Sequence, residues 1–167
     1  GSFISDAVDI YDTATDTWST DTLPNARYIR FIGSGIDFDG KAYFAGGVVG
    51  DNRATDAIDI YDPLTDTWTT ERLSTPRAAI EVAKTDNFIL FVGGSSRVRL
   101  NTGSIQNSSN VVDIYNKVTD TWTVHNLDND RIGHAAIGID NQIFIIGGFE
   151  LTPALNIVEN IDIFTDA

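Results

Sequence analysis

Arginine is the side chain whose placement in this sequence best suits binding chemistry. Three arginines each follow a tryptophan by nine residues, and three more lie in neighbouring segments. A guanidinium group can hold a carboxylate or phosphate through two parallel hydrogen bonds, which the ammonium group of lysine cannot do. We therefore take arginines as the candidate ligand-binding residues. The six candidates are Arg27, Arg30, Arg77, Arg97, Arg99 and Arg131.

The other reactive side chains predict no catalytic residue, metal site or cofactor. The sequence has no cysteine, which excludes thiolate chemistry, and only two histidines, His125 and His134. Aspartate-rich turns such as residues 62–66 lack the spacing of a calcium-binding loop and suit turn capping instead. Four aspartates recur between apolar neighbours, and we expect each to make a structural hydrogen bond or ion pair. These are Asp9, Asp59, Asp113 and Asp162.

One repeated stretch organises the chain around these residues. Residues 57–68 read AIDIYDPLTDTW, and the same pattern surrounds Trp18 and Trp122 and begins again at Ile161. Successive tryptophans are 50 and 54 residues apart, and each follows a tyrosine by seven residues. Self-similarity at a period near 50 residues indicates a repeat array.

Each repeat predicts four short antiparallel strands and no helix. The stretch ending at the tyrosine alternates apolar and polar residues, breaks at Asp or Asn, and resumes at Thr-Trp, which is typical of a hairpin. Two further strands follow, joined by turn dipeptides that favour positive φ: Asp39-Gly40, Asp140-Asn141 and, more weakly, Asp86-Asn87. The second of these strands always ends in a pair of glycines. Four such strands make one blade of a β-propeller.

The glycine pair after an apolar strand, followed by a Tyr-Asp-Pro-x-Thr-Asp-Thr-Trp hairpin, resembles the kelch repeat along essentially the whole chain. The resemblance implies an all-β propeller whose blades run from strand A, before the tight turn and innermost, through B and C to the outermost strand D. We interpret the tryptophans as packing residues between blades and the glycines as close-packing or positive-φ positions. The expected structural residues are Tyr11, Trp18, Gly46, Gly47, Tyr61, Trp68, Gly93, Gly94, Tyr115, Trp122, Gly147 and Gly148.

The order of strands predicts an arc of about three four-stranded blades within a larger ring. The chain should open with strands C and D, continue through two full blades, and close with A, B and C. The expected repeats within the segment 1–167 are 1–22 (partial), 23–72, 73–126 and 127–167 (partial). A ring that its own termini close needs two end pieces that together make one four-stranded blade, but here the pieces have two and three strands. Propellers also usually have four to eight blades. We expect the remaining blades from a longer chain or a partner copy.

The blade order also sorts the positive charges by face. In an up-and-down blade the D–A and B–C connections emerge on one face, and the A–B and C–D turns on the other. All eight arginines, including Arg53 and Arg72, fall on or next to the first kind of connection, whereas all three lysines fall near the second. In kelch substrate adaptors an arginine ahead of strand A, as in Arg131-Ile132-Gly133, lines the peptide-binding face. The lysines are Lys41, Lys84 and Lys117.

This sorting favours a noncatalytic module that binds a protein or glycan through the D–A and B–C face. Acidic neighbours such as Asp56 and Glu71 on the same face leave open that rim ion pairs simply hold the arginines. A propeller enzyme of mutarotase or sialidase type, acting on an acidic sugar, is the alternative, although no Ser-x-Asp-x-Gly-x-Thr-Trp box is present. A structural building block of a surface assembly is a third class.

Composition narrows the partners and the setting. A net charge of −13 argues against nucleic acid and against anionic membranes, and no apolar run is long enough to span a membrane. Asn107-Ser108-Ser109 is an acceptor tripeptide for N-glycosylation. Together with the lack of cysteine and methionine, it slightly favours an extracellular or cell-surface location.

Overall fold

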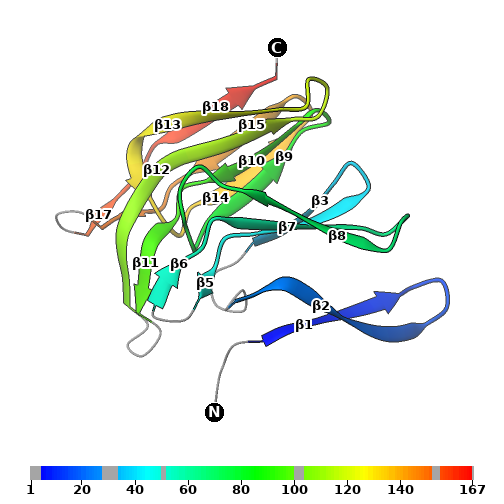
Figure 1. The fold of residues 1–167 in the computed structure, drawn as a ribbon. Helices are drawn as coiled ribbons and strands as arrows, with labels where there is room; N and C mark the ends of the chain where they lie inside the picture. Colours follow the sequence, from blue (N-terminus) through cyan, green and yellow to red (C-terminus); the bar gives the residue numbers. More distant parts are fainter. Residues whose placement is uncertain (1–4, 28–33, 50–51, 100–103, 152–154, 167) are drawn as a thin grey trace.

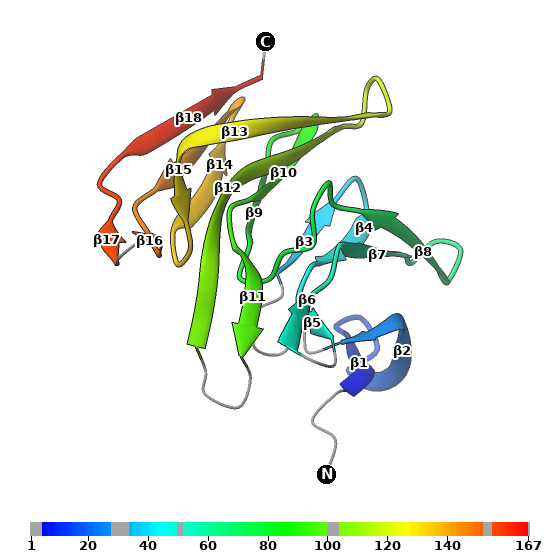
Figure 2. The same ribbon diagram turned by 60° about the vertical axis from the view of Figure 1, so that its left-hand side comes forward.

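The structure is a computed structural model that describes residues 5–27, 34–49, 52–99, 104–151 and 155–166. Within these ranges the chain is all-β, and thirteen strands form four consecutive blade sheets while five short strands join the blades. Figures 1 and 2 show the blades following one another along an arc, with β1 and β18 at its opposite ends. The predicted order of C and D, two full blades, and then A, B and C is confirmed.

The first two blades come from the N-terminal half. β1 (Ser5–Asp12) and β2 (Thr17–Arg27) form an antiparallel hairpin, which supplies strands C and D of the first blade. The second blade is a complete four-stranded sheet in the order β3-β4-β7-β8. Its strands are β3 (Ser34–Phe38), β4 (Lys41–Ala45), β7 (Ala57–Asp62) and β8 (Thr67–Arg72).

The third blade is again complete, and the fourth has three strands among the described residues. The third blade consists of β9 (Glu81–Lys84), β10 (Phe88–Val92), β12 (Ser104–Asn116) and β13 (Thr121–Arg131). The fourth consists of β14 (Ala135–Ile139), β15 (Gln142–Ile146) and β18 (Ile161–Thr165).

The B–C connections contain short strands in addition to the four strands predicted for each repeat. β5 (Val48–Val49), β6 (Arg53–Ala54), β11 (Ser95–Arg99) and the first half of β12 pair into a small sheet between the second and third blades. In the B–C connection of the third blade, the described residues 95–99 and 104–110 are strand. It folds this way because one side of the sheet buries Val48, Ala54, Ala78 and Val98 in a core of its own. β16 (Phe149–Glu150) and β17 (Asn156–Ile157) form the matching hairpin in the fourth blade.

A tyrosine and an aspartate hold each C–D turn. The hydroxyls of Tyr11 and Tyr61 donate to Asp16 and Asp66, five residues later, and Tyr115 donates to Asp120 in the same way. All three aspartates have positive φ. The predicted positive φ is also present in the A–B turns at Asp39, Gly40 and Asp140, whereas Asp86 and Asn87 do not show it.

Apolar cores fill the spaces between successive blades. Between the second and third blades, Phe38, Tyr43, Ile58 and Phe91 are buried in one cluster, against which Trp122 packs. Between the third and fourth, Leu90, Val112 and Ile143 belong to a second cluster. Each strand therefore turns alternate side chains toward the blade before it and the blade after it.

The two ends of the arc expose surfaces that are covered between internal blades. Trp18 contacts only Tyr11 among the described rings and is 70% exposed, whereas its counterpart Trp68 packs against both Tyr61 and Phe44, at 5.1 and 5.9 Å between ring centroids. The Trp68 indole also donates to Asp21 of β2, in the preceding blade. These contacts support the packing interpretation of the repeated tryptophan.

Candidate ligand-binding face

Arg77 lies in the D–A connection between β8 and β9, as expected, but its side chain is only 1% exposed. Its guanidinium group donates hydrogen bonds to the backbone carbonyls of Phe91, Gly93 and Val111. It also forms an ion pair with Asp113, one of the recurring aspartates of the C strands. Burial lowers the pKa of Arg77 and the negative charge of Asp113 opposes that effect. The Arg77 side chain thus connects strand B (β10) to strand C (β12) of the third blade.

Arg131 repeats this arrangement in the fourth blade. Its guanidinium group is fully buried, donates to the Gly147 carbonyl, and pairs with Asp162 at 2.5 Å. The recurring aspartate of strand C and the arginine before strand A are therefore partners in both blades. The buried pairs leave these guanidinium groups inside the protein, which counts against a role as direct ligand contacts for Arg77 and Arg131.

The same arginines also connect neighbouring blades through their carbonyl groups. Gly47 of the second blade donates its N–H to the Arg77 carbonyl at 3.1 Å, and Gly94 of the third donates to the Arg131 carbonyl at 2.9 Å. Gly46 has a φ of +66°, and a Cβ there would clash with the Arg77 carbonyl. In the second and third blades, the glycine pairs are thus positions where the backbone of the arginine before the next blade approaches closely.

A separate group of arginines is open to solvent on the small sheet of the B–C connections. Arg53 of β6 and Arg97 of β11 lie directly opposite each other across an antiparallel pair, and Arg99 lies two residues further along β11 on the same side. All three are exposed, and no described acidic side chain forms an ion pair with them. Like charges directly opposite on paired strands destabilise a sheet. A bound anion would remove that repulsion.

A pocket of about 440 Å³ lies beside Arg53, between the second and third blades. It lies among D–A and B–C connections, on the face to which the sequence assigned the arginines. Its polar lining consists of Arg53, Thr75, Arg77, Ser96, Asn107, Ser108 and Ser109. The hydroxyl and amide groups, together with the guanidinium group of the exposed Arg53, can bind a hydroxylated or anionic group through several hydrogen bonds.

Two other candidates cannot be placed. The side chain of Arg27, at the end of β2, and the whole of Arg30 lie outside the described residues. Asn107, the candidate for glycosylation, is exposed with a φ of +58° at the rim of the pocket.

The lysines differ from the exposed arginines because each has an acidic partner. Lys41 pairs with Asp62 at 3.3 Å within the second blade. Lys84 and Lys117 of the third blade pair with aspartates of the second at 2.6 and 3.1 Å. These partners are Asp37 and Asp39 respectively.

His134 is buried between the third and fourth blades, and neither of its ring nitrogens has a hydrogen-bond partner among the described residues. Burial, with the positive charges of Arg131 and Arg77, lowers the pKa of His134 to about 4. The imidazole is therefore neutral at pH 7. In the described part of the chain, no three histidine, aspartate or glutamate side chains are grouped so as to hold a metal ion.

Residues 38–72, from the end of β3 to the end of β8, match the family model described as the kelch motif. The chain carries a kelch motif. This match confirms the resemblance to kelch repeats, which generally mediate protein interactions and are usually noncatalytic. A search of curated proteins found no match. The described residues include no helix of the length and apolarity needed to cross a membrane.

Arg53 lies on the D–A and B–C face, as the blade order predicts, but it was not among the six candidates, and the sequence does not predict that Arg53 and Arg97 lie opposite each other. Their pairing joins residues 44 positions apart through strands of two to five residues. No periodic pattern in the sequence marks such a contact. The pairing of Arg77 with Asp113 did have a signal, because both positions recur in register in every complete repeat.

Proposed function

We propose that this kelch chain is a noncatalytic binding module that recognises an anionic group of a protein or glycan through the D–A and B–C face. The observation that carries the proposal is the opposed pair of exposed arginines, Arg53 and Arg97, without a described acidic partner. In a chain with a net charge of −13, six other positive side chains of the described residues each pair with an aspartate. Arginines that have no acidic partner among the described residues and lie opposite each other suit a carboxylate, sulfate or phosphate from outside.

The neighbouring pocket supports the same proposal and favours binding over catalysis. Arg53 lines the pocket, so a group held by the arginines can extend toward the hydroxyls of Ser96 and Ser108. The described lining contains no carboxylate, imidazole or phenol that could serve as a general acid or base. A sugar or a polar peptide segment fits such a lining.

The test uses two probes of known composition, a hexaglutamate peptide and an oligogalacturonate, titrated against the chain by calorimetry. Charged hydrogen bonds contribute about 1.5–3 kcal/mol each, so replacing both Arg53 and Arg97 with alanine should weaken binding by about tenfold or more. Replacing both with lysine should lose much of the affinity, because lysine keeps the charge but not the two parallel hydrogen bonds. The melting temperature should stay unchanged or rise slightly, because the repulsion between the arginines is removed.

Lys41→Ala and Lys117→Ala are the controls on the opposite face. Equal losses from these variants would place the binding surface elsewhere. Unchanged binding of both probes to the double alanine variant would refute a role for the arginine pair. The difference between the two probes then distinguishes a peptide ligand from a glycan ligand.

A further inference from the structure

The pocket beside Arg53 is lined by hydrogen-bond donors and by no acidic side chain among the described residues. Arg53 contributes a guanidinium group from β6, and Asn107 contributes an amide group from β12. Arg77 also lines the pocket, but its guanidinium group is used within the third blade. Four hydroxyl groups belong to the lining as well, those of Thr75, Ser96, Ser108 and Ser109. A ligand with several acceptor oxygens suits such a lining.

Backbone hydrogen bonds position two of these hydroxyl groups. Ser108 Oγ accepts a hydrogen bond from the N–H of Leu151 at 3.0 Å, and Ser109 Oγ accepts one from the N–H of Val111 at 3.2 Å. Neither hydroxyl donates to an acceptor among the described residues. The hydrogen of each hydroxyl group is therefore available to a ligand in the pocket.

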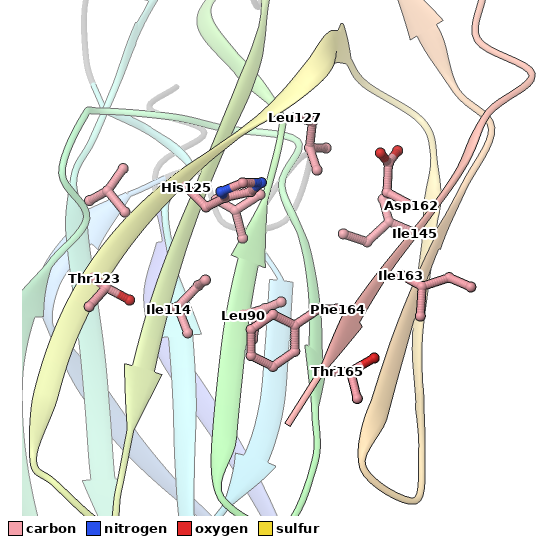
Figure 3. A pocket seen from close by; sticks show the side chains of 12 residues that line it. Leu90, Ile114, Thr123, His125, Leu127, Ile145, Asp162, Ile163, Phe164 and Thr165 are labelled. Carbon is pink, nitrogen blue, oxygen red and sulfur yellow. The ribbon is translucent and has the colours of Figure 1, made fainter. Parts of the chain in front are cut away.

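A second hollow between blades, of about 480 Å³, has a different lining. Figure 3 shows the hydrocarbon side chains of Leu90, Ile114 and Phe164 around it. Its polar lining includes the Asp162 carboxylate, which accepts hydrogen bonds and donates none when ionised. The number of donors thus distinguishes the pocket beside Arg53 from this other space between blades.

The number of donors also distinguishes between kinds of anionic group. An ionised carboxylate has about four lone-pair positions on two oxygens, and the guanidinium fork of Arg53 alone can occupy two of them. A phosphate monoester has three terminal oxygens and a charge of about −1.5 to −2 at pH 7. It can accept hydrogen bonds from Arg53 and from hydroxyl groups such as those of Ser96 and Ser108 at the same time.

We propose that this pocket binds a phosphate monoester carried by a protein partner, as phosphoserine or phosphothreonine. The inference rests on the proposed function and narrows it, because it names the anionic group and its source. A volume of about 440 Å³ leaves room for the side chain that carries the phosphate. Ala54, Pro76 and Val111 lie in the same lining and can contact its carbon atoms. A polypeptide is the source that we name because kelch repeats generally mediate protein interactions.

Fluorescence anisotropy tests the proposal with labelled glycine-rich peptides that differ only in a central phosphoserine or γ-carboxyglutamate. γ-Carboxyglutamate carries two carboxylates, so its peptide is the matched control for charge. The phosphoserine peptide should bind to the chain about tenfold or more tightly than this control, because it accepts more hydrogen bonds. Equal binding of the two peptides, or no saturable binding of the phosphoserine peptide, would overturn the inference. The proposed function would then still stand if binding of hexaglutamate or oligogalacturonate depended on Arg53 and Arg97.

A competition experiment separates a protein source from a sugar source. Glucose 6-phosphate carries the same phosphate monoester and should displace the labelled phosphoserine peptide less effectively than the unlabelled peptide does. Equal displacement by the two competitors would show that the pocket does not distinguish a phosphorylated protein, which contradicts the proposal.

A variant of the chain locates the phosphate in the pocket. Replacing Thr75 with valine and Ser96 with alanine removes two donors from exposed positions, where the fold should tolerate the change. This double variant should weaken binding of the phosphoserine peptide about tenfold or more and affect hexaglutamate less. Ser104→Ala is the matched control, because Ser104 lies on β12 opposite Arg99 and does not line the pocket. An equal loss in this control, or an equal loss for both probes, would refute the role of the hydroxyl groups.

Discussion

Replacing Arg77 with methionine should destabilise the chain strongly, although an arginine at a binding face would be expected to tolerate the change. The substitution keeps the length of the side chain and removes its charge. It leaves the Asp113 carboxylate buried, with the backbone N–H of Ser74 as its remaining hydrogen-bond donor among those described. The carbonyls of Gly93 and Val111 lose the donor that the guanidinium group supplied.

The size of the effect follows from this burial. Removing one partner of a buried ion pair costs about 3–5 kcal/mol, because the other charge stays uncompensated. The upper half of that range applies here, since Arg77 also donates to backbone carbonyls. A loss of about 4 kcal/mol in a protein of this length corresponds to a fall of roughly 8–16 °C in melting temperature.

Thermal and urea unfolding followed by circular dichroism measure this loss directly. Arg72→Met is the matched control, because Arg72 pairs with Asp56 at the surface and such pairs contribute about 0–1 kcal/mol. The double variant Arg77→Met with Asp113→Leu should recover much of the stability, since no charge is then left buried. A loss under about 1 kcal/mol for Arg77→Met, or one no larger than that of Arg72→Met, would refute the buried role of Arg77.

Two further predictions concern Trp68 and His134. Trp68→Ala should cost about 3 kcal/mol, because the indole packs against two rings and donates to Asp21. Trp18→Ala should cost under about 1 kcal/mol, because Trp18 is largely exposed, and equal losses in urea unfolding would contradict the packing role. His134 takes up its proton near pH 6.5 when unfolded but near pH 4 when folded, so the unfolded state binds more protons between these values. Stability should therefore fall by up to about 3 kcal/mol as the pH drops from 6.5 through 4. His134→Gln should remove this part of the fall and His125→Gln should not; a fall unaltered by His134→Gln would show that other groups cause it.

The blade order could be predicted because its signals are local. Alternating residues before each tyrosine, turn dipeptides such as Asp39-Gly40, and a fixed tyrosine–tryptophan spacing each act within a few residues. The structure shows the same strands and, at Asp39 and Asp140, the expected positive φ. Local patterns of this kind determine which strands form and which neighbours they pair with.

Whether each arginine is buried in an ion pair or exposed could not be predicted from these local patterns, because it depends on contacts between residues far apart in the sequence. Arg77 meets Asp113 across 36 positions and Arg131 meets Asp162 across 31. Identical residue types therefore have opposite environments, buried for Arg77 and exposed for Arg97, although both lie on connections of the same face. The strands of the B–C connection in the third blade, β11 and the first half of β12, had no comparable signal, because they pair mainly with each other and are rich in polar residues.

The tyrosine–aspartate bond in each C–D turn has a consequence for the order of events in folding. It joins residues five apart, as between Tyr61 and Asp66, whereas the contact of Trp68 with Asp21 closes 47 residues and that of Arg77 with Asp113 closes 36. Hairpins form within about 1–10 μs, and contacts between distant residues form more slowly because a longer loop must close first. The C–D hairpins should thus appear as independent nuclei, and the arginine and tryptophan contacts then join finished hairpins into neighbouring blades.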